Sequence, residues 1–157
     1  MRLPPGGKHW YVVPRVGFPD RQTFAASYEA LAQALDTELE LDPATTVLGG
    51  FSQGAVMALA LGLGAGRPRP AGILALSGFI PTVDGWSVEP QNRSGLPVVI
   101  AHGQQDPVIP VDFARSARTQ LEAAGADLLY RETPMGHTID PRVIPELSSW
   151  LGAVPRA

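Results

Sequence analysis

A pentapeptide, Gly50-Phe51-Ser52-Gln53-Gly54, holds the residue best suited to covalent chemistry. It fits the pattern G-x-S-x-G, in which a serine stands on a sharp turn between a strand and a helix. The glycines occupy positions where a side chain would collide, and the turn lifts the serine oxygen above the sheet. The pattern therefore indicates Ser52 as a nucleophile. Such a hydroxyl becomes reactive only when a base takes its proton and a carboxylate orients that base.

The sequence around Ser52 supplies the context that the pattern requires. Residues 45–48 form a short β-prone run that ends in two glycines, and residues 53–63 are apolar almost all round. The second run is typical of a helix buried against a sheet. The N–H of Gln53 opens that helix and can point at a developing oxyanion, helped by the helix dipole. The alternative interpretation is a structural turn in which Ser52 only caps the helix.

His137 is the strongest candidate for the base among the 3 histidines. It follows Gly136 on a loop expected between the last strand and the last helix, and the glycine allows close approach. His102 ends an apolar strand, where a lone histidine is more often a hydrogen-bonded structural residue, and it stays open as an alternative base. His9 lies inside a strand pattern near the terminus and is the weakest candidate.

The orienting carboxylate is predicted to be Asp106, which follows the strand that ends near His102. This position gives the chain order Ser, Asp, His that is described for one class of hydrolases. The alternative is that Asp106 is only a turn residue before a proline. Asp112 and Asp140 are better explained as caps of the helices that follow them.

Strands and helices alternate along the chain, which predicts a three-layer α/β domain with a mostly parallel sheet of about five strands. Residues 81–95 are polar and rich in Gly, Pro and Ser, so we expect a loop there, and a single domain over residues 1–157. The expected strands are residues 9–13, 45–48, 73–76, 97–101 and 127–131, and the expected helices are residues 24–39, 53–63, 113–124 and a last one after Asp140.

Composition limits the classes of partner. The chain has 157 residues, 45% of them hydrophobic, a net charge of -3 and no block of like charge, so neither nucleic acid nor an anionic membrane is an expected partner. It has no cysteine, which excludes disulfides and a thiolate nucleophile. No apolar run reaches the length of a signal peptide or a membrane span, so a cytoplasmic location is expected.

Four stretches together resemble the carboxylesterase, lysophospholipase and acyl-protein thioesterase family of α/β-hydrolases. They are GGFSQGA (49–55), LSGFIP (76–81), HGQQDPVIP (102–110) and MGHTI (135–139). They span about two-thirds of the chain in the family's order, which is more specific than one motif. The resemblance implies an esterase acting on carboxylic esters or thioesters, with Ser52, Asp106 and His137 as its triad. It implies no cofactor and no metal.

The N-terminus departs from that family. Its members begin with further strands, including a central one whose following loop donates the second oxyanion hydrogen bond, so we expect an N-terminally shortened fold. Three outcomes stay open: the strand at residues 9–13 pairs directly beside the nucleophile strand, a homodimer covers the exposed sheet edge, or the sequence is a truncated gene product. Losing one oxyanion donor costs on the order of 3 kcal/mol, or about a hundredfold in rate.

We expect hydrolysis of small, short-chain esters through an acyl-Ser52 intermediate. The rivals are a thioesterase or lysophospholipase, and a noncatalytic α/β-hydrolase-like binding protein. Apolar residues next to the motifs are the predicted walls of the substrate pocket, although each could equally belong to the core. These residues are Phe51, Phe79, Ile80, Ile109 and Met135.

Overall fold

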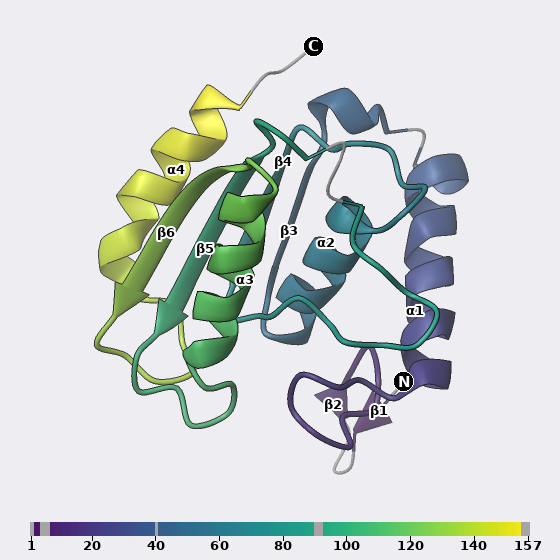
Figure 1. Ribbon diagram of the computed structural model, residues 1–157, viewed down its shortest axis with the longest axis horizontal. Helices are drawn as coiled ribbons and strands as arrows, with labels where there is room; N and C mark the ends of the chain where they lie inside the picture. Colours follow the sequence, from purple (N-terminus) through teal and green to yellow (C-terminus); the bar gives the residue numbers. More distant parts are fainter. Residues whose placement is uncertain (1, 4–6, 40, 90–92, 155–157) are drawn as a thin grey trace.

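A parallel sheet of four strands forms the centre of the protein (Figure 1). The computed structural model describes residues 2–3, 7–39, 41–89 and 93–154. The strands pair in the order in which they occur, so their carboxyl ends all meet at one edge of the sheet. They are β3 (Val47–Phe51), β4 (Gly72–Leu76), β5 (Pro97–Gly103) and β6 (Asp127–Thr133).

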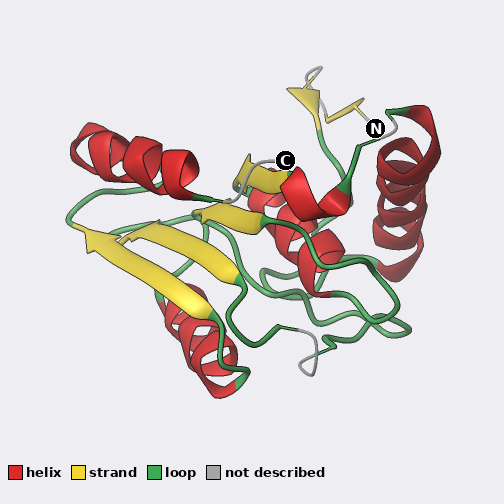
Figure 2. Ribbon diagram, turned by 90° about the horizontal axis from the view of Figure 1, so that it is seen from above, coloured by secondary structure: helices red, strands yellow, loops and turns green. Residues whose placement is uncertain are grey.

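Helices cover both faces of this sheet, which gives the expected three layers (Figure 2). Helices α2 (Gln53–Leu63) and α3 (Asp112–Ala123) pack on one face, where alanine and leucine side chains meet alternate residues of β4 and β5. A 3₁₀ turn (Pro141–Val143) and α4 (Ile144–Ala153) pack on the other. These features confirm the predicted three-layer α/β architecture, with four parallel strands described where about five were expected.

A second apolar cluster lies on the outer side of α2. Tyr11 and Phe24 meet edge to face there, with ring centroids 5.7 Å apart, and Phe79 and Met57 complete the cluster. Phe24 comes from α1 (Arg21–Gln33), which continues as a π turn (Ala34–Glu38). Because α2 is enclosed between the sheet and this cluster, apolar residues all round it are the expected pattern.

The strand predicted at residues 9–13 is wrong. Two short strands, β1 (Arg2–Leu3) and β2 (Gly7–Lys8), form a separate antiparallel pair, and the chain after Lys8 is irregular. β-Branched and aromatic residues favour a strand only where a neighbouring strand and a packing surface are available. Here the Tyr11 ring is buried against α1 and α2, so tertiary packing overrides the local preference.

The predicted pairing of residues 9–13 beside the nucleophile strand is wrong as well, because β4 is the one described strand that pairs with β3. The Ser52 N–H donates to the Leu76 carbonyl at 2.9 Å, so the backbone groups of Ser52, and of every second residue before it on β3, point toward β4. N–H and C=O of one strand residue point to the same side. The backbone groups of Val47, Gly49 and Phe51 therefore face the open edge, the edge of the sheet beside which no described strand lies.

The remaining expectations differ from the structure in detail. Strands β5 and β6 each run two residues beyond the predicted ends, and residues 81–95 form the expected loop, of which 90–92 lie outside the described residues.

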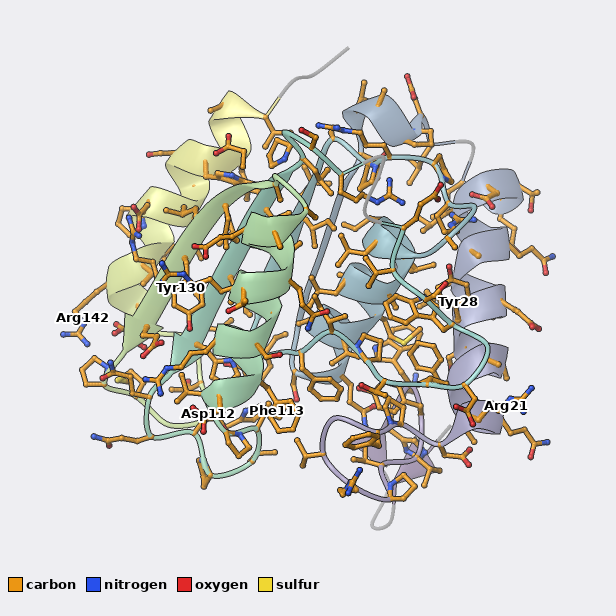
Figure 3. All side chains as sticks on the ribbon, in the orientation of Figure 1. Arg21, Tyr28, Asp112, Phe113, Tyr130 and Arg142 are labelled. Carbon is orange, nitrogen blue, oxygen red and sulfur yellow. The ribbon has the colours of Figure 1, made fainter. Side chains whose placement is uncertain are left out.

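Asp140 caps the last helical segment, accepting from the Arg142 N–H at 2.9 Å. Asp112 is not a cap: Val111 precedes α3, and Asp112 begins it and pairs with Arg115 at 3.1 Å (Figure 3).

Candidate active site

Ser52 stands on the tight turn between β3 and α2, with φ 56° and ψ −123°. Positive φ at a residue other than glycine is strained and needs support from the surrounding structure. Gly50 makes the turn possible, because a Cβ there would lie 2.3 Å from the carbonyl carbon of Gly54. The Ser52 side chain makes no capping hydrogen bond to α2, so the interpretation of Ser52 as a mere helix cap is wrong.

His137 reaches Ser52 from the loop that follows β6. Its Nε2 lies 2.9 Å from the Ser52 Oγ, and its Nδ1 lies 2.7 Å from Oδ2 of Asp106. The Asp106 carboxylate only accepts, so Nδ1 carries the proton and Nε2 accepts from the serine hydroxyl. The ring of Phe51 lies against the imidazole, with centroids 4.9 Å apart. Close approach of the two loops depends on Gly103, where a Cβ would meet the Gly136 carbonyl oxygen at 2.2 Å.

Asp106 is held as an ionised carboxylate beneath the imidazole. Its Oδ1 accepts from the N–H groups of Val108 and Ile109, both at 2.8 Å, and Oδ2 faces His137. Burial on its own would raise the pKa of Asp106, but the hydrogen bonds from Ile109, His137 and Val108 outweigh it and hold the pKa below the ordinary value. A fixed negative charge here favours the imidazolium that forms when His137 takes a proton.

His102, the alternative base, is hydrogen-bonded to the backbone of the Asp106 loop. Its side chain is fully buried, and Nε2 lies 2.8 Å from the carbonyl oxygen of Ile109 and 3.4 Å from Oδ2 of Asp106. A base must lie within hydrogen-bond reach of the hydroxyl that it deprotonates. His137 meets that requirement, whereas neither His102 nor His9 forms a hydrogen bond with Ser52.

Gln53 contributes to this site through its backbone N–H and, separately, through its side-chain amide. Its backbone N–H is the first of α2, one of the N–H groups that a helix leaves free, and it lies directly after the nucleophile. Its side-chain amide accepts from the Trp10 N–H at 2.9 Å and donates to the Tyr11 carbonyl at 3.1 Å. The sequence analysis missed this clamp, because no local pattern joins residues that lie more than 40 positions apart.

The predicted pocket residues fall into two groups. Phe51 is 37% exposed and Met135 is half-buried, so both offer surface near the catalytic side chains. Phe79 and Ile109 are 2% and 5% exposed and belong to the apolar cluster outside α2, and Ile80 packs against the main core. These last three pack in or against the core, the alternative that was open for each of them, and their part in a substrate pocket stays a prediction.

An apolar groove lies beside the nucleophile strand. A hollow of about 170 Å³ separates β3 and α2 from α1, and one of about 470 Å³ adjoins it, sharing Trp10 and Leu31. Leu31 of α1 and Leu35 of the π turn line the first hollow. The main lining residues are Trp10, Leu31, Leu35, Leu48, Met57 and Leu61.

The described part of the chain holds no group of three or more His, Asp or Glu side chains arranged to bind a metal ion. Among its helices, none has the length and apolar character needed to cross a membrane.

Curated proteins similar to this chain include thioesterases and a carboxylesterase. Acyl-protein thioesterase 1 of Gibberella zeae is 33% identical over 113 residues, which cover 69% of this chain and 48% of the relative. Carboxylesterase SOBER1 of Arabidopsis thaliana is 26% identical over 153 residues, covering 92% of this chain and 67% of the relative. The chain thus spans about half the length of the thioesterases it matches, a share of 48% and 49% in two of them.

Solved structures agree on the fold. The Bacillus cereus carboxylesterase superposes with a TM-score of 0.79 at 22% identity, over 94% of this chain and 69% of that one. Esterase PE8 gives a TM-score of 0.72 at 28% identity, over 97% and 72%. The model of one family, described as phospholipase/carboxylesterase, matches residues 3–154. The chain therefore belongs to the phospholipase/carboxylesterase family of α/β-hydrolases.

Proposed function

We propose that the protein is a serine hydrolase that cleaves carboxylic esters through an acyl-Ser52 intermediate. The observation that carries the proposal is the line of contacts from Ser52 through His137 to Asp106, at 2.9 Å and 2.7 Å. A serine in a strained turn, a base within reach and a buried carboxylate behind that base are the three parts that nucleophilic acyl transfer needs.

The reaction follows from the positions of these atoms. The Ser52 Oγ attacks the carbonyl carbon while its proton passes to Nε2 of His137, and the Gln53 N–H binds the oxyanion that forms. The intermediate collapses, and the leaving alcohol takes the proton from Nε2. Water then attacks the acyl group, loses a proton to Nε2 and releases the acid, and the proton returns to Ser52. Asp106 keeps its charge throughout.

Short-chain esters are the preferred substrates in this proposal. Support comes from the surroundings of Ser52, where Phe51 and Met135 offer limited apolar surface and two of the other expected wall residues are buried in the core. Thioester cleavage is a second candidate, because several relatives bear the name acyl-protein thioesterase 1. Both reactions use the same acyl-enzyme and differ only in the leaving group.

A second copy of the chain is the partner that we propose for the open edge of β3. An unpaired row of N–H and C=O groups next to an apolar groove is a template for pairing with another chain. The backbone of Val47, Gly49 and Phe51 and the 170 Å³ hollow beside it support this proposal. We retain a single domain over the whole chain as part of the same hypothesis.

Pre-steady-state kinetics with p-nitrophenyl acetate and butyrate test the enzymatic proposal. A burst of p-nitrophenolate equal to the concentration of sites, with the acyl group found on Ser52 by mass spectrometry, is the expected result. Ser52→Ala should remove the burst and lower kcat by at least about a thousandfold, whereas Ser116→Ala, at an exposed serine of α3, should change neither.

Failure of this test has a defined meaning. A protein that releases p-nitrophenolate without a burst, and at the same rate after Ser52→Ala, is not a serine hydrolase, and the noncatalytic binding protein becomes the better hypothesis. Matched oxygen esters and thioesters of the same acyl group then decide the leaving group, and acetyl, butyryl and octanoyl esters decide the chain length.

A further inference from the structure

His102 is a buried histidine that the proposed reaction does not use. It is 2% exposed and lies near the carboxyl end of β5, directly before the loop that carries Asp106. A polar side chain in such a place costs stability unless it forms hydrogen bonds. His102 forms one hydrogen bond, through Nε2, whereas its buried Nδ1 has no partner in the described part of the chain, so the Nε2 contact indicates its role.

The position of one proton follows from the acceptor. Nε2 of His102 lies 2.8 Å from the Ile109 carbonyl oxygen, which cannot donate, so Nε2 carries the hydrogen. The same N–H lies 3.4 Å from Oδ2 of Asp106, at the margin of a hydrogen bond. His102 thus presents a donor both to the backbone of the turn and to the carboxylate within it.

These contacts link His102, Asp106 and Ile109 in a ring of interactions around the turn from Asp106 to Ile109. The Ile109 N–H donates to Oδ1 of Asp106 at 2.8 Å, while the Ile109 carbonyl accepts from His102. One residue of the turn is therefore held at both its donor and its acceptor. With Oδ1 occupied in this way, Oδ2 is left facing His137 at 2.7 Å.

We propose that His102 is a positioning residue, which fastens the Ile109 carbonyl and so fixes the Asp106 carboxylate in the orientation that His137 needs. The proposal rests on the hydrolase function described above. Loss of this donor leaves a buried carbonyl unpaired and frees the turn, so that the carboxylate no longer holds His137 in one orientation. A displacement of about 1 Å at a catalytic group lowers the rate by about a hundredfold.

A pair of amide variants isolates the contact. In His102→Gln the side-chain N–H₂ extends about as far as Nε2 and can donate to Ile109, whereas the shorter amide of His102→Asn cannot. We expect His102→Gln to keep kcat for p-nitrophenyl acetate within about threefold of the wild type, and His102→Asn to lower it about tenfold to a hundredfold with little change in KM. Equal kcat values for the two variants would overturn the proposal.

A second variant in β5 serves as the control for a general loss of stability. Val98→Ala removes buried volume from β5 without touching the Asp106 turn, so it should lower the melting temperature and leave kcat unchanged. If Val98→Ala lowers kcat as much as His102→Asn, the effect is one of general stability and the positioning role is wrong.

A spectroscopic measurement separates this proposal from the hydrolase function itself. The His137 Nδ1 proton, hydrogen-bonded to Asp106, should give a far-downfield proton NMR signal in the wild type and in His102→Gln. The signal should broaden or disappear in His102→Asn. This result is expected even if no ester is cleaved, and an unchanged signal in His102→Asn would contradict the role of His102 whatever the activity.

Discussion

The two edges of the sheet are built differently. The outer strand β6 carries charged side chains along its length, and they form ion pairs to both sides: Arg131 pairs with Glu146 of α4, and Glu132 pairs with Arg115 of α3 at 2.8 Å. Strand β3, at the opposite edge, has the sequence Val-Leu-Gly-Gly-Phe without any charge. Charges on an edge strand discourage pairing with other chains, and β3 lacks this protection.

The compositions of the two edge strands indicate different positions in a sheet. β6 has the composition of a strand that ends a sheet, whereas an uninterrupted apolar run such as β3 is typical of a strand with neighbours on both sides. The nucleophile therefore stands on the less supported side of the sheet. His137 and Asp106, the residues proposed to activate Ser52, lie on the loops after β6 and β5, where hydrogen bonds and ion pairs hold the structure.

The largest loss of kcat among these predictions is expected from a change in the tight turn that follows β3 and carries Ser52. Gly50→Ala places a Cβ 2.3 Å from the Gly54 carbonyl carbon, so the backbone of the turn must move. We expect kcat to fall by about a hundredfold or more. Steady-state kinetics with p-nitrophenyl acetate measure the fall in kcat.

Gly54→Ala is the matched control, from the same motif. The expectation that a side chain would collide at both glycines of the motif is wrong for Gly54, where a Cβ meets only the Trp10 indole nitrogen, at 3.9 Å. Because alanine also favours a helix, kcat and stability should be retained. Equal losses in the two variants would show that the turn does not depend on the close contact between Gly50 and Gly54.

A moderate effect is expected at the open edge. Val47→Lys places a charge on β3, as β6 already has, and should weaken the self-association proposed for this edge. Analytical ultracentrifugation over a range of concentrations measures it. The reciprocal variant Arg131→Val removes a charge from β6 and should increase association. A wild-type protein that stays monomeric at every concentration would contradict the homodimer.

The smallest effect concerns the acid sensitivity of the β6 edge. Hydrogen bonds from Arg115 lower the pKa of Glu132 from 4.5 to about 2, against the opposing effect of burial. A carboxylate with a lowered pKa stabilises the fold above its unfolded-state pKa, and this contribution is lost as the pH falls through the folded value. The free energy of unfolding should therefore fall between about pH 4.5 and 2, and less so in Glu132→Gln.

Chemical denaturation at a series of pH values gives this free energy. Asp127→Asn, at an exposed residue of the same strand, is the control and should keep the wild-type dependence on pH. A Glu132→Gln variant with the wild-type slope would show that the ion pair with Arg115 does not link stability to pH.

Much of the fold could be predicted from the sequence, because its long apolar and periodic segments determine their own structure. The helix at residues 53–63 and the strands that lead to Asp106 and His137 are patterns of this kind. The strand predicted at residues 9–13 failed because Trp10 and Tyr11 bind a distant glutamine side chain instead of a neighbouring strand. Asp112 failed as a cap because Val111 already precedes the helix.

The contacts among the three predicted catalytic residues could be anticipated from the sequence, but the contacts that hold the surrounding side chains in place could not. Ser52, Asp106 and His137 belong to short motifs whose position at strand ends brings them to one edge of the sheet, and the structure places them in contact. The buried ring of His102 and the amide of Gln53 act through contacts with backbone groups. Such contacts leave no periodic pattern in the sequence, so only the folded chain reveals them.

The clamp formed by Gln53 also gives the protein an optical reporter. It fixes the backbone of Trp10, whose indole nitrogen lies 3.9 Å from the place where a Cβ on Gly54 would stand, so a fluorescent ring sits beside the nucleophile turn. The other tryptophans, Trp86 and Trp150, pack against the outer side of α2 and against α4's side of the sheet. In a variant that keeps Trp10 and replaces these two by phenylalanine, emission would follow acylation of Ser52 in real time.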